Sequence, residues 1–440
     1  MSGFKLIRFL APLIIFSIIF SADPWVYSTL LAASDGHAGD SFGTAVAVSG
    51  DFIVVGSPYA HAGSNASQGA AYVFQKSTAG WSSPLTEVAE LTSTDGVNGD
   101  YFGNSVAISG DTIVVGAYSM NSNQGRAYVF VKPPTGWAGP ITQTATLTTL
   151  HPTTQGDLFG YSVAIAGDTI LVGATWDSHW NPPGSGAAYI YLKPADGWAG
   201  TLTQDATLSP SDTTGDFGTS VALSGDTAVV GSTYNKVYVY EKPGGGWADM
   251  AAQTAELTDP GTVLYHDYFG LAVATNGDTV VVGAPQTTVG GHYQQGEAYV
   301  YAKPGAHWTN MSNANAKLLG TFAISYANSC DFGFTAAVDG DTIAVSAATG
   351  GINQDGQKGA IFLYQKPVGG WSGTLISSDM VTYHPSGVNS EDYGLSFAMT
   401  DQVLLAGAPG AQVGSNKNQG VIYVHTPQVQ VHLYLPVIAR

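Results

Sequence analysis

A pair made of an aromatic residue and glycine returns seven times along the chain, at intervals of 52 to 63 residues. Five residues after each aromatic stands an alanine, and eight or nine residues after it stands an aspartate. Repetition at such a period indicates one structural unit that is copied and stacked on its neighbours. The seven pairs are Phe42-Gly43, Phe102-Gly103, Phe159-Gly160, Phe217-Gly218, Phe269-Gly270, Phe332-Gly333 and Tyr393-Gly394.

Each copy has the pattern of four short strands joined by tight turns. In the first copy, Gly50-Asp51 separates two apolar segments, and glycine and aspartate tolerate the backbone angles of a hairpin. The composition agrees, because 56 glycines and only 10% charged residues are typical of an all-β protein and not of a helical bundle. The strands expected in this copy are Phe42–Ser49, Phe52–Gly56, Ala71–Phe74 and Glu87–Thr92.

Seven four-stranded units predict a ring of blades. The last unit ends at Ile422–Val424 without a fourth strand, while Ser28–Ala33 lies just upstream of the first unit, where a fourth strand belongs. Supplying the missing strand from the N-terminal side would close the ring and remove an exposed edge. We therefore expect an all-β, seven-bladed β-propeller over residues 28–425, with four antiparallel strands per blade and an N-terminal strand that completes blade seven.

The two ends of the chain differ from the repeats. Residues 1–22 begin with Lys5 and Arg8 and continue as an uncharged, largely apolar run, which is the order of a secretory signal peptide. The run is shorter than the ~20 residues of a membrane span, and an uncleaved N-terminal anchor is the alternative. Residues 426–440 form a C-terminal tail. We expect a secreted or cell-surface protein that contacts a membrane only if the anchor is kept.

Charge and cysteine content exclude several classes of function. The net charge of −18 disfavours nucleic acid or anionic lipid as a partner, because both need a basic surface. Cys330 is the single cysteine, so an intrachain disulfide cannot form and a cysteine metal site has too few ligands. We expect Cys330 to be a small buried residue.

The repeat resembles a known family. Its most complete copy, Phe269-Gly270 followed by Val281-Val282-Gly283-Ala284-Pro285, resembles the FG-GAP repeat of the integrin α-chain β-propeller. Gly407-Ala408-Pro409 and Gly56-Ser57-Pro58 are close to the same pattern. The resemblance covers about residues 28–425. It implies a propeller outside the cell that mediates adhesion or binds an extracellular protein, matrix or glycan ligand.

One departure from the integrin pattern concerns metal binding. Calcium-binding integrin blades carry an Asp-rich loop between Phe-Gly and Gly-Ala-Pro, whereas this chain has only a short Gly-Asp turn, as in the bacterial form of the repeat. One carboxylate cannot supply the about 6–8 oxygen ligands of calcium. We therefore expect no cofactor and no metal at Asp51 and its equivalents. Weak metal candidates remain among the loop carboxylates Asp35, Asp40, Asp95 and Asp100.

The variable sequence is concentrated at one end of the blades. In an antiparallel meander, the loops between second and third strands share a face with the blade-to-blade loops, and these loops differ most between copies. Binding residues concentrate on loops carried by a rigid scaffold, so this face is the expected binding site. The ligand-binding candidates on it are His61, Trp176, His179, Trp180, His292 and Tyr293.

Six tryptophans repeat in the turn between third and fourth strands, each behind a lysine. They either pack onto the blades or, if exposed, stack on sugar rings as in a propeller lectin. Trp176 and Trp180 break this pattern on the variable face. The repeated tryptophans are Trp81, Trp137, Trp198, Trp247, Trp308 and Trp371.

A catalytic role has little support in the sequence. The ten histidines are scattered, and no H-E-x-x-H, G-x-S-x-G or C-x-x-C motif occurs. His37, His151, His266 and His384 lie in blade-to-blade loops and could converge near the axis. We predict a binding or adhesion module and not an enzyme. The alternatives are a carbohydrate-binding propeller and, less favoured, a hydrolase or lyase with a site in the central channel.

Overall fold

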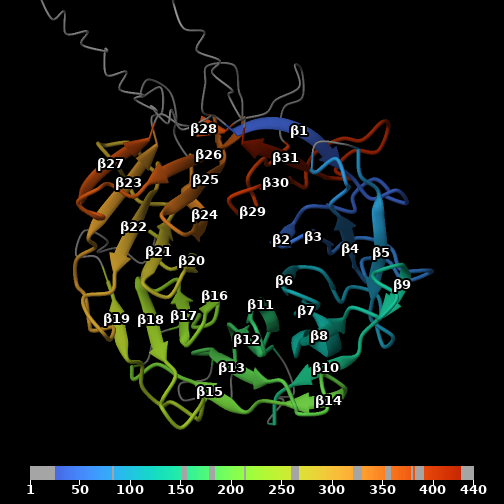
Figure 1. Ribbon diagram of the computed structural model, residues 1–440, viewed down its shortest axis with the longest axis horizontal. Helices are drawn as coiled ribbons and strands as arrows, with labels where there is room; N and C mark the ends of the chain where they lie inside the picture. The colour runs from blue at the N-terminus through green and yellow to red at the C-terminus, as the bar shows by residue number, and fades with distance from the viewer. Residues whose placement is uncertain are drawn as a thin grey trace, which may run out of the picture.

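The computed structural model forms a closed ring of seven small β-sheets around a central axis (Figure 1). The described residues are 25–81, 84–150, 156–177, 184–212, 215–258, 267–320, 330–351, 358–377, 380–381 and 391–427. In blades one to six the blade's own strands pair in chain order from the axis outward, whereas in blade seven the outermost strand is the first of the chain. The predicted all-β, seven-bladed propeller is therefore confirmed. Among the residues just given, the only helical element is the short α1 (Met120–Asn123), a loop segment of blade two in which Asn121 and Ser122 have left-handed backbone angles.

The strands of blades one to three follow the expected pattern closely. Blade one contains β2 (Ala45–Ser49), β3 (Phe52–Ser57), β4 (Ala70–Gln75) and β5 (Glu87–Thr92). Blade two contains β6 (Ser105–Ser109), β7 (Thr112–Ala117), β8 (Arg126–Val131) and β10 (Ala145–Thr148). Blade three contains β11 (Phe159–Ala166), β12 (Thr169–Ala174), β13 (Ala187–Leu192) and β15 (Ala206–Leu208).

The next three blades repeat this arrangement. Blade four contains β16 (Ser220–Ser224), β17 (Thr227–Ser232), β18 (Lys236–Glu241) and β19 (Ala255–Leu257). Blade five contains β20 (Ala272–Thr275), β21 (Thr279–Ala284), β22 (Glu297–Ala302) and β23 (Ala316–Gly320). Blade six contains β24 (Phe332–Asp339), β25 (Thr342–Gly351), β26 (Lys358–Gln365) and β28 (Met380–Val381).

Blade seven is built from both ends of the propeller, as predicted. It contains β29 (Phe397–Met399), β30 (Leu404–Ala408), β31 (Val421–Pro427) and, outermost, β1 (Trp25–Leu31). β1 pairs antiparallel with β31, from Trp25 opposite Pro427 to Leu31 opposite Ile422. The closing strand thus begins three residues before the expected segment Ser28–Ala33. Figure 1 shows the first and last strands side by side.

Some blades contribute a short parallel strand to the preceding blade, which the four-strand pattern did not predict. After its third strand, the chain crosses to the outer edge of the preceding blade before it forms its own fourth strand. In this way β9 (Gly139–Thr142) pairs with β5, β14 (Gly200–Thr203) with β10, and β27 (Gly373–Ser377) with β23. The sheets of blades one, two and five therefore have five strands.

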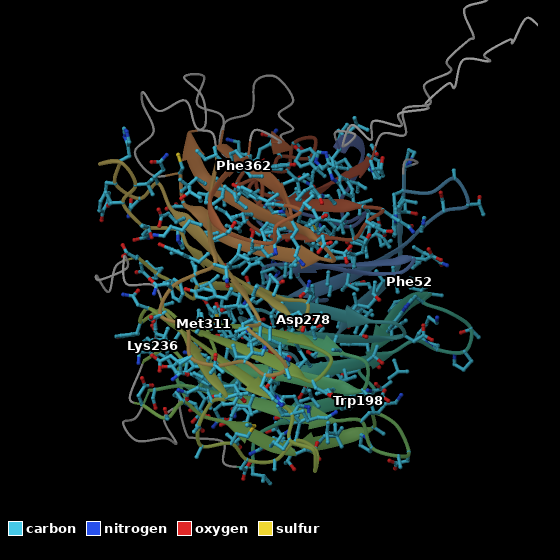
Figure 2. All side chains as sticks on the ribbon, turned by 60° about the vertical axis from the view of Figure 1, so that its left-hand side comes forward. Phe52, Trp198, Lys236, Asp278, Met311 and Phe362 are labelled. Carbon is cyan, nitrogen blue, oxygen red and sulfur yellow. The ribbon has the colours of Figure 1, made fainter. Side chains whose placement is uncertain are left out.

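The core consists of one apolar cluster at each junction between blades. The aromatic residue of each Phe-Gly or Tyr-Gly pair is buried in the cluster shared with the preceding blade, and all seven are 0–2% exposed. The six repeated tryptophans are also buried, at 2–7% exposed, so they pack the blades and cannot stack on a ligand. Figure 2 shows the side chains that fill the blades, with Trp198 labelled. Cys330 is fully buried, as expected.

The Gly-Asp turns belong to the scaffold. The backbone N–H of Lys76 donates to the carbonyl of Asp51 at 2.8 Å, and the same bond recurs in the next five blades. In five of these six blades the lysine ammonium also reaches the aspartate carboxylate, for example 3.2 Å from Lys193 Nζ to Asp168 Oδ1. These pairs are exposed, so each adds little stability. They place Asp51 and its equivalents in turns beside a lysine, on the face opposite the variable loops.

Blade seven has a histidine where the other blades have an aromatic core residue. His425 is 1% exposed, and its Nε2 lies 2.9 Å from the Tyr393 hydroxyl. Burial lowers the pKa of His425 from 6.5 to about 4, because the charged imidazolium loses its hydration. The unfolded chain therefore takes up a proton near pH 6.5, whereas the folded protein resists protonation until about pH 4.

This difference predicts a pH dependence of stability. Above pH 6.5 the contribution of His425 to the free energy of unfolding is fully present. The free energy of unfolding should fall by about 3 kcal/mol as the pH drops to about 4. The double variant His425→Phe/Tyr393→Phe copies the Phe42 and Phe74 pair of blade one and should lose this part of the pH dependence. Urea titrations of both proteins between pH 4 and 7 measure it. Parallel stability curves for the two proteins would contradict the assignment.

Candidate ligand-binding face

The variable loops lie together on one face of the ring, here called the loop face. At five of the seven junctions, the loop between second and third strands hydrogen-bonds to the blade-to-blade loop that follows. The N–H of Phe42 donates to Gln419 O at 2.8 Å, that of Phe102 to Gln68 O at 2.9 Å, and that of Phe159 to Gln124 O at 3.0 Å. These bonds join the loops of neighbouring blades, which fixes the backbone of the loop face at these junctions.

The residue before each aromatic-glycine pair has a left-handed backbone. Its φ lies between 49° and 57° in all seven copies, although none is glycine. Such conformations are strained for residues with a side chain and are often found at functional sites. The aspartates close to the seven pairs occupy two different positions. The left-handed residues are Ser41, Tyr101, Leu158, Asp216, Tyr268, Asp331 and Asp392, whereas Asp40, Asp100, Asp157 and Asp267 stand one residue earlier and are buried.

Four tyrosines form a continuous row on the loop face across blades one, two and three. Tyr59 contacts Tyr101 with ring centroids 5.2 Å apart, Tyr101 stacks on Tyr118 at 5.7 Å, and Tyr118 contacts Tyr161 at 5.5 Å. Burial and the neighbouring rings raise the pKa of Tyr118 to about 12, so its hydroxyl stays neutral. Tyr59, at the end of the row, is 44% exposed. We call Tyr59, Tyr101, Tyr118 and Tyr161 the tyrosine row.

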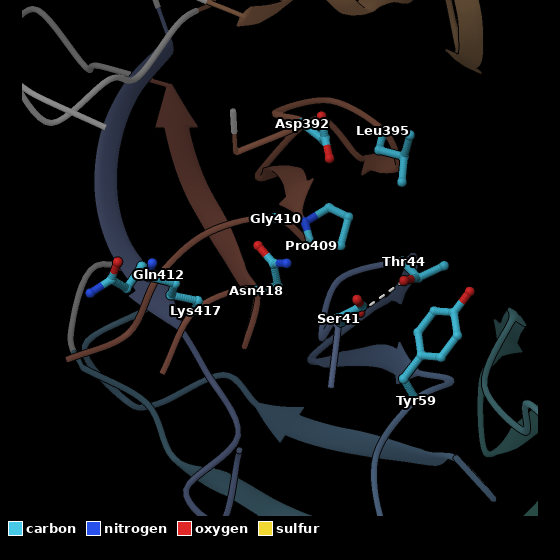
Figure 3. A pocket seen from close by; sticks show the side chains of 10 residues that line it. All are labelled: Ser41, Thr44, Tyr59, Asp392, Leu395, Pro409, Gly410, Gln412, Lys417 and Asn418. Carbon is cyan, nitrogen blue, oxygen red and sulfur yellow. Dashed lines mark hydrogen bonds between the residues drawn. The ribbon is translucent and has the colours of Figure 1, made fainter. Parts of the chain in front are cut away.

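The tyrosine row ends at a cavity between blades seven and one. Its volume is about 780 Å³, and Tyr59 lines it together with hydroxyl, carboxylate, amide and ammonium groups. Figure 3 shows Ser41, Thr44 and Tyr59 on one side of this cavity and Asp392 and Leu395 on another. The remaining polar lining comes from Gln412, Lys417 and Asn418 of blade seven. An aromatic ring beside convergent polar groups is a typical lining for a ligand site.

A buried carboxylate lies at the same blade junction, beneath two histidines. Asp40 is 2% exposed and its Oδ2 accepts a 2.6 Å hydrogen bond from the N–H of His37. The Nδ1 atoms of His37 and His61 each lie 4.0 Å from a carboxylate oxygen of Asp40. Both imidazoles are mostly exposed. When protonated, they would pair with Asp40, but at 4.0 Å neither makes a hydrogen bond to it.

The predicted ligand residues lie on the loop face but in different sectors. His61 lies in blade one, Trp176 in blade three, and His292 and Tyr293 in blade five. Trp176 is 59% exposed and Tyr293 60%. His179 and Trp180 lie outside the described residues, as do His151, His266 and His384. The tyrosine row was missed, because its four members stand at four different positions of the repeat.

The weak metal candidates have structural partners. Asp35 accepts a hydrogen bond from the hydroxyl of Tyr72, and Asp95 accepts one from Tyr128 and pairs with Arg126. Asp100 Oδ2 accepts a 2.6 Å hydrogen bond from the N–H of Val97. Asp40 Oδ2 accepts the equivalent bond from the N–H of His37, in the loop between blades seven and one. Within the ranges described above, no three His, Cys, Asp or Glu side chains gather in a way that could hold a metal ion.

The comparisons with known proteins bear on the family and the fold. The sequence model of the FG-GAP repeat matches residues 25–74, 85–130, 141–191, 202–241 and 252–301, which is more than half of the chain. The chain belongs to the FG-GAP repeat family. The resemblance seen in the sequence is thereby confirmed. A search of curated proteins finds no match to this FG-GAP protein.

A solved structure supports the propeller fold independently. The crystal structure of the WD40 β-propeller domain of Doa1 is similar, with a TM-score of 0.51 and 9% sequence identity. The match covers 92% of this chain and 97% of that one. At this identity the similarity concerns the fold alone.

Proposed function

We propose that this FG-GAP propeller is a secreted or cell-surface binding module that recognises a protein or matrix ligand on its loop face. The observation that carries the proposal is the tyrosine row, which runs into a cavity of about 780 Å³. Tyrosine is enriched at binding surfaces because it offers a large rigid ring and a polar hydroxyl. Support for export comes from the signal-like residues 1–22, which lie outside the described range.

The proposal also concerns how the propeller is attached to a membrane. Among the residues that the structure describes, no helix is long and apolar enough to cross a membrane. A retained N-terminal anchor would place the propeller at the cell surface, and cleavage would release it. We expect no nucleic-acid partner, because the net charge is −18.

Two variants test the binding site. Tyr59→Ala should weaken ligand binding about 10-fold or more, because it removes the ring shared by the cavity and the tyrosine row. Tyr234→Ala is the matched control, since Tyr234 follows the second strand of blade four at the same distance and is also 44% exposed. Binding is measured by capture of surface proteins and matrix material, followed by titration of the recovered ligand. Equal affinities of the two variants would contradict the proposed site.

Carbohydrate binding is the second candidate function. It is favoured by Tyr59 and Trp176, whose side chains are 44% and 59% exposed and offer aromatic faces to sugar rings. A glycan array, read with and without calcium, separates it from protein binding. Hits lost in Tyr59→Ala or Trp176→Ala would make the lectin function the better proposal.

Among the described residues, His37, His61 and Asp40 are the candidates for the hydrolase or lyase alternative. A general base should lie within about 3.2 Å of the proton that it takes, and a nucleophile should stand beside it. The 4.0 Å separations and the exposed imidazoles give this alternative less support than binding. We therefore propose a non-enzymatic role.

A further inference from the structure

The hydroxyl groups of the tyrosine row differ from those inside the blades. Most third-strand tyrosines donate a hydrogen bond to the protein itself, as Tyr423 does to Glu391 Oε2 at 2.6 Å. The four hydroxyls of the tyrosine row have no such partner among the residues that the structure describes, and all four rings are at least partly exposed. They are therefore donors that a ligand can use. The other third-strand tyrosines with a bonded hydroxyl are Tyr72, Tyr128, Tyr189, Tyr191, Tyr238, Tyr299 and Tyr301.

The middle of the tyrosine row carries no charge. The pKa of Tyr118 is raised by burial and then by the neighbouring tyrosines, and no carboxylate or ammonium of the described residues contributes to the shift. A ligand segment that lies along these rings should therefore be uncharged. It should offer apolar surface to the rings and hydrogen-bond acceptors to the neutral hydroxyls.

The backbone that carries the rings is held by hydrogen bonds. The N–H of Tyr101 donates to Ser67 O at 3.3 Å, and its carbonyl accepts the N–H of Asn104 at 3.1 Å. The N–H of Tyr161 donates to Leu158 O at 3.1 Å. Because the rings are already in place before a ligand arrives, little conformational freedom is lost on the protein side when it binds.

A carboxylate lies near the blade-three end of the row. Burial and then the Asp216 carboxylate raise the pKa of Tyr161, the last ring of the row. Asp216 Oδ2 accepts a 2.7 Å hydrogen bond from Thr233 Oγ1. Within the described ranges, Asp216 makes no ion pair with a lysine or arginine. In a chain of net charge −18, this end of the row favours a ligand that brings a basic residue.

The spacing of the rings matches the repeat of a polyproline II helix. Successive ring centroids are 5.2, 5.7 and 5.5 Å apart, so that alternate gaps lie within two ring steps of each other. One turn of polyproline II takes three residues and advances about 9 Å, which falls within two such steps. Prolines three positions apart can therefore enter alternate gaps. The carbonyl groups of this helix have no internal partners and can accept from the tyrosine hydroxyls.

We propose that the tyrosine row binds a proline-rich segment in the polyproline II conformation, with a basic residue of that segment beside Asp216. The inference rests on the proposed function, because it names the ligand class of the same loop face. Prolines fit the uncharged rings, backbone carbonyls meet the hydroxyls, and the basic residue pairs with the carboxylate. A neutral sugar chain would also offer apolar faces and hydroxyls, but it brings no cation to Asp216.

Peptide titrations on the full chain test the proposal. The probe has nine prolines, about three turns of polyproline II, with an arginine at each end, and the reference is a Gly-Ser peptide of the same length with the same arginines. The polyproline peptide should bind at least ~10-fold more tightly, because it is already ordered and offers rings to the row. Equal affinities of the two peptides would overturn the proposal.

A matched pair of variants locates the binding. Tyr101→Ala should weaken binding of the polyproline peptide about 10-fold or more, because it removes an inner ring of the row. Tyr268→Ala is the control, since Tyr268 stands at the same position of the repeat in blade five, with a φ of 54° against 55° for Tyr101. It is not part of the row and should leave the affinity unchanged. Equal losses in both variants would contradict binding at the row.

Two variants that keep the size of the side chain test the polar contacts. Tyr118→Phe removes one hydroxyl and should weaken the polyproline peptide about 3- to 10-fold. Asp216→Asn should lower the affinity for the arginine-flanked peptide to that of nine prolines with uncharged ends, and should leave the latter unchanged. An Asp216→Asn protein that still prefers the arginine-flanked peptide would overturn the placement of the basic residue.

Failure of this inference can be told apart from failure of the proposed function. If Tyr59→Ala weakens binding of a captured surface ligand but the parent protein does not prefer the polyproline peptide, the loop face binds a ligand of another class and the inference is overturned. Glycan hits that Tyr101→Ala removes, without binding of the polyproline peptide, would assign the row to carbohydrate and overturn it as well.

Discussion

Replacing Leu31 by alanine is expected to lower the free energy of unfolding by about 2–5 kcal/mol. Leu31 ends the closing strand β1, is fully buried and packs into the apolar cluster between blades seven and one. Its backbone lies opposite Ile422 of β31. Truncating it leaves a cavity at the point where the two ends of the propeller hold the ring closed. Chemical denaturation followed by tryptophan fluorescence measures the loss.

The neighbouring residue provides the control. Leu30 lies on the same strand but is 37% exposed, and Leu30→Ala should change stability by about 0.5 kcal/mol or less. Deleting Ser28–Ala33 as a whole removes most of β1 and exposes the edge of β31, so we expect cooperative folding to be lost. A deleted chain that keeps the parent Tm would refute the role of β1 in closure.

The fold could be predicted because its determinants are local and repeated. Each Gly-Asp turn indicates a hairpin, and each apolar segment beside it indicates a strand. Because the pattern occurs in seven copies, an ambiguous strand in one copy can be assigned from the others. Ring closure could be predicted because the last copy lacks a fourth strand and a strand-like segment precedes the first copy. The parallel crossings were missed, because β9, β14 and β27 are only four or five residues long and pair with another blade.

The candidate site was less accessible to sequence reasoning. Tyr59 follows a second strand, whereas Tyr101 precedes an aromatic-glycine pair, so no fixed spacing links them. They meet because the blade-to-blade loop of one unit lies against the second-to-third loop of its neighbour. Only the ring geometry reveals that contact. Trp176 was found because it departs from the repeat, a signal that detects single exposed residues but not rows shared between blades.

Replacing Gly56 by alanine is expected to cost about 3 kcal/mol or more. A Cβ on Gly56 would lie 1.9 Å from the carbonyl oxygen of Gly103 in the next blade. That oxygen cannot move away freely, because the N–H of Gly103 donates to Gly116 O at 3.0 Å and Gly103 has a φ of +92°. The glycine of the second strand and the glycine of the aromatic-glycine pair are therefore needed together, for close approach of neighbouring backbones.

Two further glycines separate this steric effect from backbone strain. Gly50 has a φ of +55° with open space around the position of a Cβ, so Gly50→Ala should cost only the ~1–2 kcal/mol of a left-handed alanine. Gly244 has open space and no left-handed backbone, and Gly244→Ala should be neutral or slightly stabilising. Thermal and urea unfolding of the three variants should rank Gly56 well above Gly50, and Gly50 above Gly244. If Gly56→Ala cost no more than Gly50→Ala, the blades would not be held together by backbone contact, and stability would have to come from the aromatic clusters alone.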